Sequence, residues 1–155
     1  MNTKRSISEK NEILIDTTFL LPALGINVEK EAMEAIKYFH KVKVYYLEEG
    51  LLEAMWKILK MITEEKIRRV IIGIEAIRKT YTLLIPPPKA FIDAIKIYYK
   101  GHKDYIDAIH YTTALHKQKL FLTIDYEFID FLKKNNYKVN NVIITPNEFI
   151  SSLSY

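Results

Sequence analysis

Four acidic side chains stand where the chain could gather carboxylates into one site: Asp16, Glu53, Asp107 and Asp125. Asp16 ends a short apolar run at 13–15, and Asp125 follows a second run at 120–124. Short, β-branched runs of this kind predict buried strands. Because open α/β sheets bind ligands at the carboxyl edge, where the strand order reverses, we expect both acids to lie at such an edge.

Asp104 and Asp107 stand at the start of a predicted helix, three positions apart and therefore on one face. Helix capping, at about 1 kcal/mol, is an alternative role for Asp104, and equally for Asp16 and Asp125. Asp107 directly precedes Ala108, in a helix whose small residues predict close packing against the sheet. That packing would hold the Asp107 carboxylate near the strand edge.

Glu53 lies within the most apolar turn of its predicted helix. It could instead face solvent and pair with Lys57 one turn later, a contact that contributes a few tenths of a kcal/mol. Glu48 and Glu49, nearer the start of the helix, are typical first-turn acids.

Several other chemistries are excluded by the residue types present. The chain has no cysteine, which removes thiolate catalysis and Cys-ligated metals. Its four glycines form no phosphate-binding loop, and its serines form no nucleophile elbow. The four histidines lack metal-ligand spacing, and we expect them to be surface or packing residues.

The elements that must position the acids alternate along the chain. Strands are predicted at 12–16, 42–47, 82–85, 120–124 and 142–145. Helices are predicted at 19–24, 28–40, 49–61, 64–80, 89–100, 104–117 and 126–134, with a short one starting at Thr145–Pro146. This order predicts an α/β, doubly wound fold with a mostly parallel five-stranded sheet and helices on both faces. The helices at 49–61 and 64–80 should form a hairpin.

Chain length and net charge bear on the number of domains and on the kind of partner. A chain of 155 residues suits a single domain spanning 1–155, with residues 1–11 as a flexible N-terminus. The amino-terminal stretch lacks the apolar core of a signal peptide, and no apolar run is long enough for a membrane span, so we expect a cytoplasmic protein. The net charge of +4 is compatible with a nucleic-acid partner, and Tyr98 and Tyr99 could stack on its bases.

Four stretches, taken in order, resemble the acidic motifs of PIN-domain ribonucleases, including VapC-type toxins: ILIDTTFLLPAL, VYYLEEGLLEAMWKIL, DYIDAIHYTTAL and FLTIDYEF. The likeness covers nearly the whole chain. It matches Asp16 with the first motif, Glu53 with the second and Asp107 with the third. Thr123 and Asp125 match the fourth. Thr18 stands where Ser is commoner, and Glu127 stands where a second Asp is usual.

The resemblance implies a metal-dependent endoribonuclease with RNA as substrate. Its catalytic acids and metal ligands would be Asp16, Glu53, Asp107 and Asp125, supported by Thr18, Asp104, Thr123 and Glu127. Clustered carboxylates need a cation, and Mg²⁺ or Mn²⁺ prefers such oxygen ligands. A toxin of this kind would also bind an antitoxin protein and form a homodimer, with the helical hairpin as the contact surface.

The sequence leaves one alternative to this function and argues against two others. A PIN-like domain could be catalytically silent and serve as an RNA-binding or assembly module. A phosphoacceptor receiver domain would need an Asp at the end of the third strand, where the chain has Ile85, and a Lys after the fifth, where it has Thr145 and Pro146. A haloacid-dehalogenase-type phosphatase would need an Asp at position 18, which is Thr.

Overall fold

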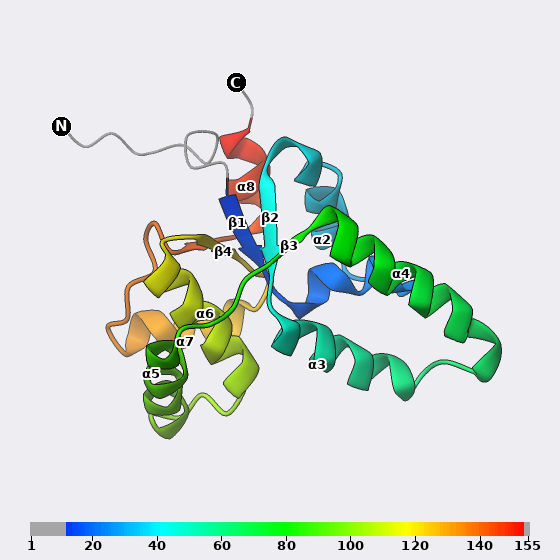
Figure 1. Cartoon of the computed structure of the whole chain (residues 1–155). Coiled ribbons are helices and arrows are strands. Elements are labelled where there is room, and N and C mark those ends of the chain that lie inside the picture. The colour runs from blue at the N-terminus through cyan, green and yellow to red at the C-terminus, as the bar shows by residue number, and fades with distance from the viewer. Residues whose placement is uncertain (1–11, 154–155) are drawn as a thin grey trace.

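The computed structural model of the chain describes residues 12–153 and shows an α/β fold (Figure 1). One sheet contains every described strand in the order β3-β2-β1-β4-β5, and all paired strands are parallel. The strands are β1 (Glu12–Ile15), β2 (Lys43–Tyr46), β3 (Thr82–Leu83), β4 (Leu120–Leu122) and β5 (Ile143–Ile144). The predicted doubly wound sheet of five strands is confirmed. The predicted flexible segment at 1–11 lies outside the described residues.

Helices connect the strands close to the predicted positions. They are α2 (Lys30–Ile36), α3 (Glu48–Leu59), α4 (Ile67–Thr80), α5 (Pro88–Tyr99), α6 (Tyr105–Lys117), α7 (Tyr126–Lys134) and α8 (Pro146–Ser152). Four single turns are 3₁₀ helices: η1 (Thr17–Leu20), η2 (Pro22–Leu24), η3 (Phe39–Lys41) and η4 (Glu64–Lys66). Within residues 12–153, none of these helices combines the length and hydrophobicity of a membrane-spanning segment.

Two predicted helices differ from the structure. The helix predicted at 19–24 is two 3₁₀ turns, because Pro22 has no N–H to continue a helical ladder and Gly25 ends the second turn with φ 97°. The helix predicted at 28–40 stops at Ile36. The chain then turns so that Phe39 enters the core, where its ring packs edge-on against that of Phe149.

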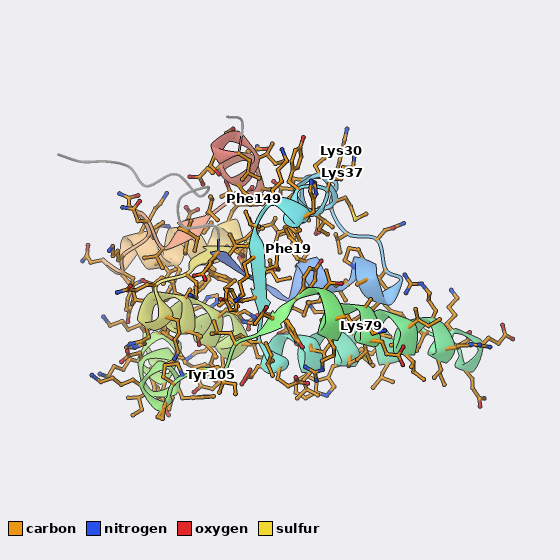
Figure 2. All side chains as sticks on the ribbon, turned by 45° about the horizontal axis from the view of Figure 1, so that its top comes forward. Phe19, Lys30, Lys37, Lys79, Tyr105 and Phe149 are labelled. Atoms are coloured by element: carbon orange, nitrogen blue, oxygen red, sulfur yellow. The ribbon has the colours of Figure 1, made fainter. Side chains whose placement is uncertain are left out.

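Side chains alternate between the two faces of the sheet, and each face has its own core. Ile13 and Ile15 point to a face covered by η1, η2, α2, α3, α4 and α8. Leu14 points to the other face, covered by α5, α6 and α7. Phe19 and Phe149, labelled in Figure 2, belong to the first core and both contact the ring of Phe39.

The strand order reverses between β1 and β4. Connections from β1 through β3 run over one face, and those from β3 through β5 run over the other, as right-handed crossovers require. Ile15 at the end of β1 therefore pairs with Leu122 at the end of β4, although the two residues are far apart in sequence. The residues that follow these two strands meet at the switch point of the sheet.

The two helices of the predicted hairpin, α3 and α4, both extend away from the sheet (Figure 1), with α3 packed on η1 and α4 packed on η2. Helix α4 approaches the backbone of η2 closely. A Cβ added to Gly73 would lie 2.2 Å from the carbonyl oxygen of Ala23. Arg69 donates from Nη1 to the same carbonyl oxygen at 2.7 Å, so α4 is held against η2 by both shape and a hydrogen bond.

Gly73→Ala should therefore destabilise the protein, by about 1–3 kcal/mol or more, because overpacking at a backbone contact forces α4 and η2 apart. The free energy of unfolding, measured by urea denaturation, tests this prediction. Glu75→Ala, on the exposed side of α4, is the control and should change stability by less than about 0.5 kcal/mol. Alanine is the better helix former by about 1 kcal/mol, so stabilisation by Gly73→Ala would show that the close approach does not exist.

Candidate active site

Asp16, directly after β1, is only 6% exposed. Its Oδ1 accepts the backbone N–H of Thr18 at 2.9 Å, and its Oδ2 accepts the Thr123 hydroxyl at 2.7 Å. Burial raises the pKa of Asp16 to about 6, against the opposing effect of the hydrogen bonds from Thr123 and Thr18. The buried carboxylate therefore accepts hydrogen bonds from residues that follow both central strands, β1 and β4.

Asp125 follows Ile124 and is the residue that caps the start of α7. Its Oδ1 accepts the backbone N–H of Phe128 at 3.0 Å, which caps the helix. Its own backbone N–H donates to the Thr123 hydroxyl oxygen at 3.1 Å. Because that hydroxyl donates in turn to Asp16, Thr123 connects the two acids through a single oxygen atom.

Asp107 enters the same region from the first turn of α6. Burial raises its pKa to about 10, reinforced by a hydrogen bond with the Asp125 carboxyl and by the negative charges of Asp104, Asp125 and Asp16. Burial and the neighbouring negative charges therefore favour the protonated form of the Asp107 carboxyl when no cation is bound. Three of the four predicted acids, Asp16, Asp107 and Asp125, are therefore brought together.

Three acids of this region also cap helices. Asp16 caps η1, Asp125 caps α7, and Asp104 caps α6 by accepting the backbone N–H of Asp107 at 3.1 Å. The cap at α7 uses only Oδ1 of Asp125. A carboxylate has a second oxygen, and each oxygen has two lone pairs, so capping and ligand binding are compatible.

Glu53 is placed differently. Its side chain is 18% exposed, and Oε1 lies 3.8 Å from Nζ of Lys57, the pairing that the sequence offered as an alternative. Across residues 12–153, no hydrogen bond or ion pair joins Glu53 to the three aspartates. On the preceding turn of α3, Oε2 of Glu49 is buried without a hydrogen-bond partner in the described structure, a feature that the sequence did not predict.

The predicted supporting residues contribute unequally. Thr123 and Asp104 contact the acids through their side chains, whereas the contact from Thr18 comes from its backbone N–H and not from its hydroxyl. Glu127 is exposed in the first turn of α7, and no hydrogen bond from its side chain is seen in the described part of the chain.

His102 is a packing residue, as predicted, but the sequence did not predict that it lies beside the acids. Its ring stacks on Phe128 with centroids 4.2 Å apart, and Nε2 lies 3.5 Å from Oδ2 of Asp107. Burial lowers the pKa of His102, while the negative charges of Asp104 and Asp125 oppose that shift. The one signal in the sequence was its position just before the Asp104–Asp107 pair.

His110 has the packing role that we predicted. Its Nδ1 lies 2.8 Å from the carbonyl oxygen of Ile106, and burial lowers its pKa to about 4, so the ring stays neutral. A Cβ added to Gly50 of α3 would lie 3.0 Å from its Nε2. The imidazole therefore sets how closely α3 approaches α6.

The donor chemistry of the site suits a hard divalent cation. Within residues 12–153, no three or more His, Asp and Glu side chains are arranged so as to hold a metal ion. Mg²⁺, however, is usually bound by only one or two carboxylates, together with waters and substrate phosphates. Asp107 and Asp125 offer such carboxylate ligands, and both Asp125 and Asp16 lie close enough for their charges to raise the pKa of Asp107.

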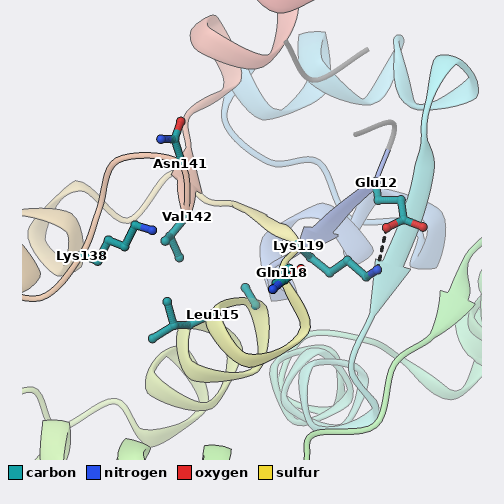
Figure 3. Close-up of a pocket in the computed structure, with 8 residues that line it drawn as sticks. Glu12, Leu115, Gln118, Lys119, Lys138, Asn141 and Val142 are labelled. Atoms are coloured by element: carbon teal, nitrogen blue, oxygen red, sulfur yellow. Dashed lines mark hydrogen bonds and ion pairs between the residues drawn. The ribbon is translucent and has the colours of Figure 1, made fainter. Parts of the chain in front are cut away.

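A separate pocket lies at the opposite, amino-terminal edge of the sheet (Figure 3). It contains Glu12 at the start of β1 and Lys119 just before β4, which form an ion pair of 2.6 Å. The hydrogen bond from Lys119 lowers the pKa of Glu12. Since these charges neutralise each other, this pocket offers no counterpart to the carboxylate cluster.

Comparison with known proteins supports the fold and leaves the family open. No protein-family model matches the sequence, and no characterised protein matches it. Among solved structures, the crystal structure of PAE2754 from Pyrobaculum aerophilum is similar, with a TM-score of 0.60 over 93% of this chain and 96% of that chain. At 17% sequence identity, the likeness shows a shared α/β fold.

The raised pKa of Asp107 predicts how stability depends on pH in the absence of metal. The folded protein keeps this proton while the unfolded chain, with a pKa near 3.8, has lost it. The free energy of unfolding should therefore fall as pH rises, by up to about 1.4 kcal/mol per pH unit, until the pH reaches about 10. Asp16 and His110 add little to this pH dependence between pH 7 and 10, since their pKa values are about 6 and about 4.

Urea denaturation in chelator across pH 7–10 measures this dependence. Asp107→Asn should remove most of the slope, whereas Asp130→Asn, the same change at an exposed position of α7, should retain it. A wild-type slope that Asp107→Asn leaves unchanged would show that Asp107 is ionised in the folded protein.

Proposed function

We propose that this chain is a metal-dependent endoribonuclease of the PIN-domain kind, acting as the toxin of a toxin–antitoxin pair. The observation that carries the proposal is the convergence of Asp16, Asp107 and Asp125 at the switch point of the sheet. A structural cap does not require three carboxyl groups so close that their charges help to raise the pKa of Asp16 and Asp107. Such an arrangement is unfavourable without a cation and typical of functional sites.

Asp107 and Asp125 are the best candidates for direct ligands of Mg²⁺ or Mn²⁺. When bound, the ion would activate a water molecule and stabilise the leaving oxygen of the phosphodiester. Asp16 would bind directly or through water, with its orientation set by the Thr123 hydroxyl. Glu53 belongs to the proposed set through the motif resemblance alone, since its carboxylate lies 3.8 Å from the Lys57 ammonium.

An exposed aromatic surface suits single-stranded RNA. Tyr99, at the end of α5, is 79% exposed, and its ring lies edge-on to that of Tyr98, 5.7 Å away between centroids. The Lys103 ammonium lies 4.3 Å from the Tyr98 centroid, one residue before Asp104. Aromatic rings beside a cation bind bases and phosphates together, so this end of α5 is the proposed path of the RNA towards the acids.

The alternative function is a catalytically silent PIN-like module that binds RNA or another protein. The capping roles of Asp16, Asp104 and Asp125 favour this alternative, because each explains an acid without catalysis. In that case RNA binding would not depend on Mg²⁺ or Mn²⁺, and cleavage would be absent.

Asp16→Asn, Asp107→Asn and Asp125→Asn should each reduce Mg²⁺- or Mn²⁺-dependent cleavage of a mixed RNA pool by at least about a hundredfold, since a catalytic metal supplies several kcal/mol. Cleavage is followed by gel electrophoresis, with chelator added to a parallel reaction. Asp130→Asn is the matched control and should cut at the wild-type rate. Asn caps helices about as well as Asp, so a capping role alone predicts little change.

Glu53→Gln and Lys57→Met separate the two roles of Glu53 in the same assay. Loss of cleavage with Glu53→Gln but not with Lys57→Met assigns the carboxylate to the site. Equal effects of the two variants would reduce Glu53 to a partner of Lys57. Wild-type cleavage that survives chelator, or that Asp16→Asn leaves intact, would refute the proposed function.

The hairpin is the proposed surface for a homodimer or an antitoxin. Its helices expose large apolar side chains: Leu52, Trp56 and Leu59 on α3, with Ile67, Ile71 and Ile72 on α4. These side chains are each 45–66% exposed. Exposed apolar side chains are typical of interaction sites where they gather into a patch.

Trp56, the only tryptophan in the chain, reports on this surface directly. If the hairpin forms the homodimer, diluting the protein should shift Trp56 emission to longer wavelength as the ring becomes exposed to water. Light scattering should give a dimer mass for wild type and a monomer mass for Ile71→Glu. Ile92→Glu on α5 is matched in residue type and exposure, 54% against 51%, and should remain dimeric. A wild-type monomer at high protein concentration would contradict the homodimer.

A further inference from the structure

An aromatic cavity at the end of α5 lies on the proposed path of the RNA. It has a volume of about 290 Å³ and is lined by Ile95, Tyr98 and Tyr99 of α5 and by Tyr105, the first residue of α6. The three residues of α5 are spaced three and four positions apart, so they share one face of the helix. Three of the four lining side chains are aromatic, and none is charged.

The walls of the cavity differ in how firmly they are held. Tyr105, labelled in Figure 2, donates from its hydroxyl to the carbonyl oxygen of Phe91 at 2.9 Å, which fixes the wall supplied by α6. Tyr98 lies edge-on to Tyr99, with an angle of 86° between the ring planes. The Tyr99 ring is the exposed wall, at 79%. The cavity therefore combines a fixed ring with an open one on which a flat molecule can stack.

The charge beside the cavity is positive. The segment 94–103 contains three lysines and no Asp or Glu. Lys96 lies 3.9 Å from the carboxylate of Asp93. The Lys103 ammonium instead donates to the carbonyl oxygen of Tyr98 at 3.2 Å and lies 4.3 Å from the centroid of its ring. A cation held beside aromatic rings favours a ligand that is both flat and anionic, as a nucleotide is.

The loop at 100–104 joins the cavity to the acids. Two of the three tyrosines precede this loop, and the third follows it. Within the loop, Nε2 of His102 lies 3.5 Å from Oδ2 of Asp107. Lys103 is the next residue, and its ammonium lies at the cavity. A strand that runs from the cavity to the acids would thus have Lys103 beside its backbone.

We propose that this cavity binds one unpaired base of a single-stranded RNA, stacked on Tyr99, while Lys103 binds a neighbouring phosphate. The inference rests on the proposed function, because it names the form of RNA that the same site would take. Such recognition tolerates different bases, since every base has a ring face that can stack. It excludes duplex RNA, whose bases are paired and stacked inside the helix.

Binding is measured on the full chain in chelator and at physiological salt, by fluorescence anisotropy, so that cleavage plays no part. The probes are labelled oligouridylate, an abasic strand of the same length, and the duplex of oligouridylate with oligoadenylate. Wild type should bind oligouridylate about 5- to 100-fold more tightly than the abasic strand, the effect expected of one stacked base. The duplex should bind more weakly than the single strand.

Variants separate stacking from charge. Tyr99→Ala should weaken binding of oligouridylate about 5- to 100-fold and leave binding of the abasic strand unchanged, whereas Tyr99→Phe keeps the ring and should bind as wild type does. Lys103→Gln should weaken both strands alike and reduce the salt slope by about 1. Tyr38→Ala is the control, because that ring also has a lysine beside it, Lys41 at 5.6 Å, but packs against the core on the other face of the sheet.

Three results would overturn the inference: equal binding of oligouridylate by Tyr99→Ala and wild type, equal binding of the strands with and without bases, or a duplex bound as tightly as the single strand. If Tyr99→Ala changes the mass measured by light scattering and leaves RNA binding intact, the cavity contacts protein and the inference fails. The proposed function survives such a failure if wild type cuts RNA with Mg²⁺ or Mn²⁺. Base-dependent binding without cleavage supports the inference and refutes the nuclease. If wild type neither binds nor cuts RNA, both fail together.

Discussion

The parallel pairing of β1 with β4 is the constraint on which the site depends. It places Ile15 beside Leu122, so the residues that follow each strand emerge next to each other. The Thr123 hydroxyl then donates to Asp16 and accepts from the backbone of Asp125. Because the strand order reverses at this pair, no crossover helix covers the gap between the two strand ends.

The same pairing creates an electrostatic cost. Asp16, Asp107 and Asp125 share a buried region in which each ionised carboxylate disfavours the next. Without a cation, a proton on Asp107 reduces the repulsion between the carboxylates. A divalent ion at the proposed site would replace that proton. Metal binding in the proposed function and the pH dependence of stability are thus linked by one set of charges.

The hairpin is held to the rest of the fold by residues other than its exposed apolar side chains. Gly73 and Arg69 hold α4 against the Ala23 carbonyl. At the other end of α4, Arg78 makes a bidentate ion pair with Glu48 at 2.6 and 2.8 Å and donates to the hydroxyl of Tyr46. These contacts hold the hairpin without its exposed apolar side chains, which are then available to a partner in the proposed assembly.

The sequence by itself determined the α/β class, because strand and helix patterns alternate locally and β-branched runs are short. It also placed Asp16 and Asp125 at strand ends, since each directly follows an apolar run. Only the tertiary structure decided which acids meet. Glu53 lies at its predicted place in the helix, yet its carboxylate is paired with Lys57. His102 had no local pattern, because its orientation comes from stacking on Phe128, a contact that exists only after α7 packs against the loop before α6. Periodicity and capping act over a few residues, whereas the direction of a side chain is set by the residues packed around it.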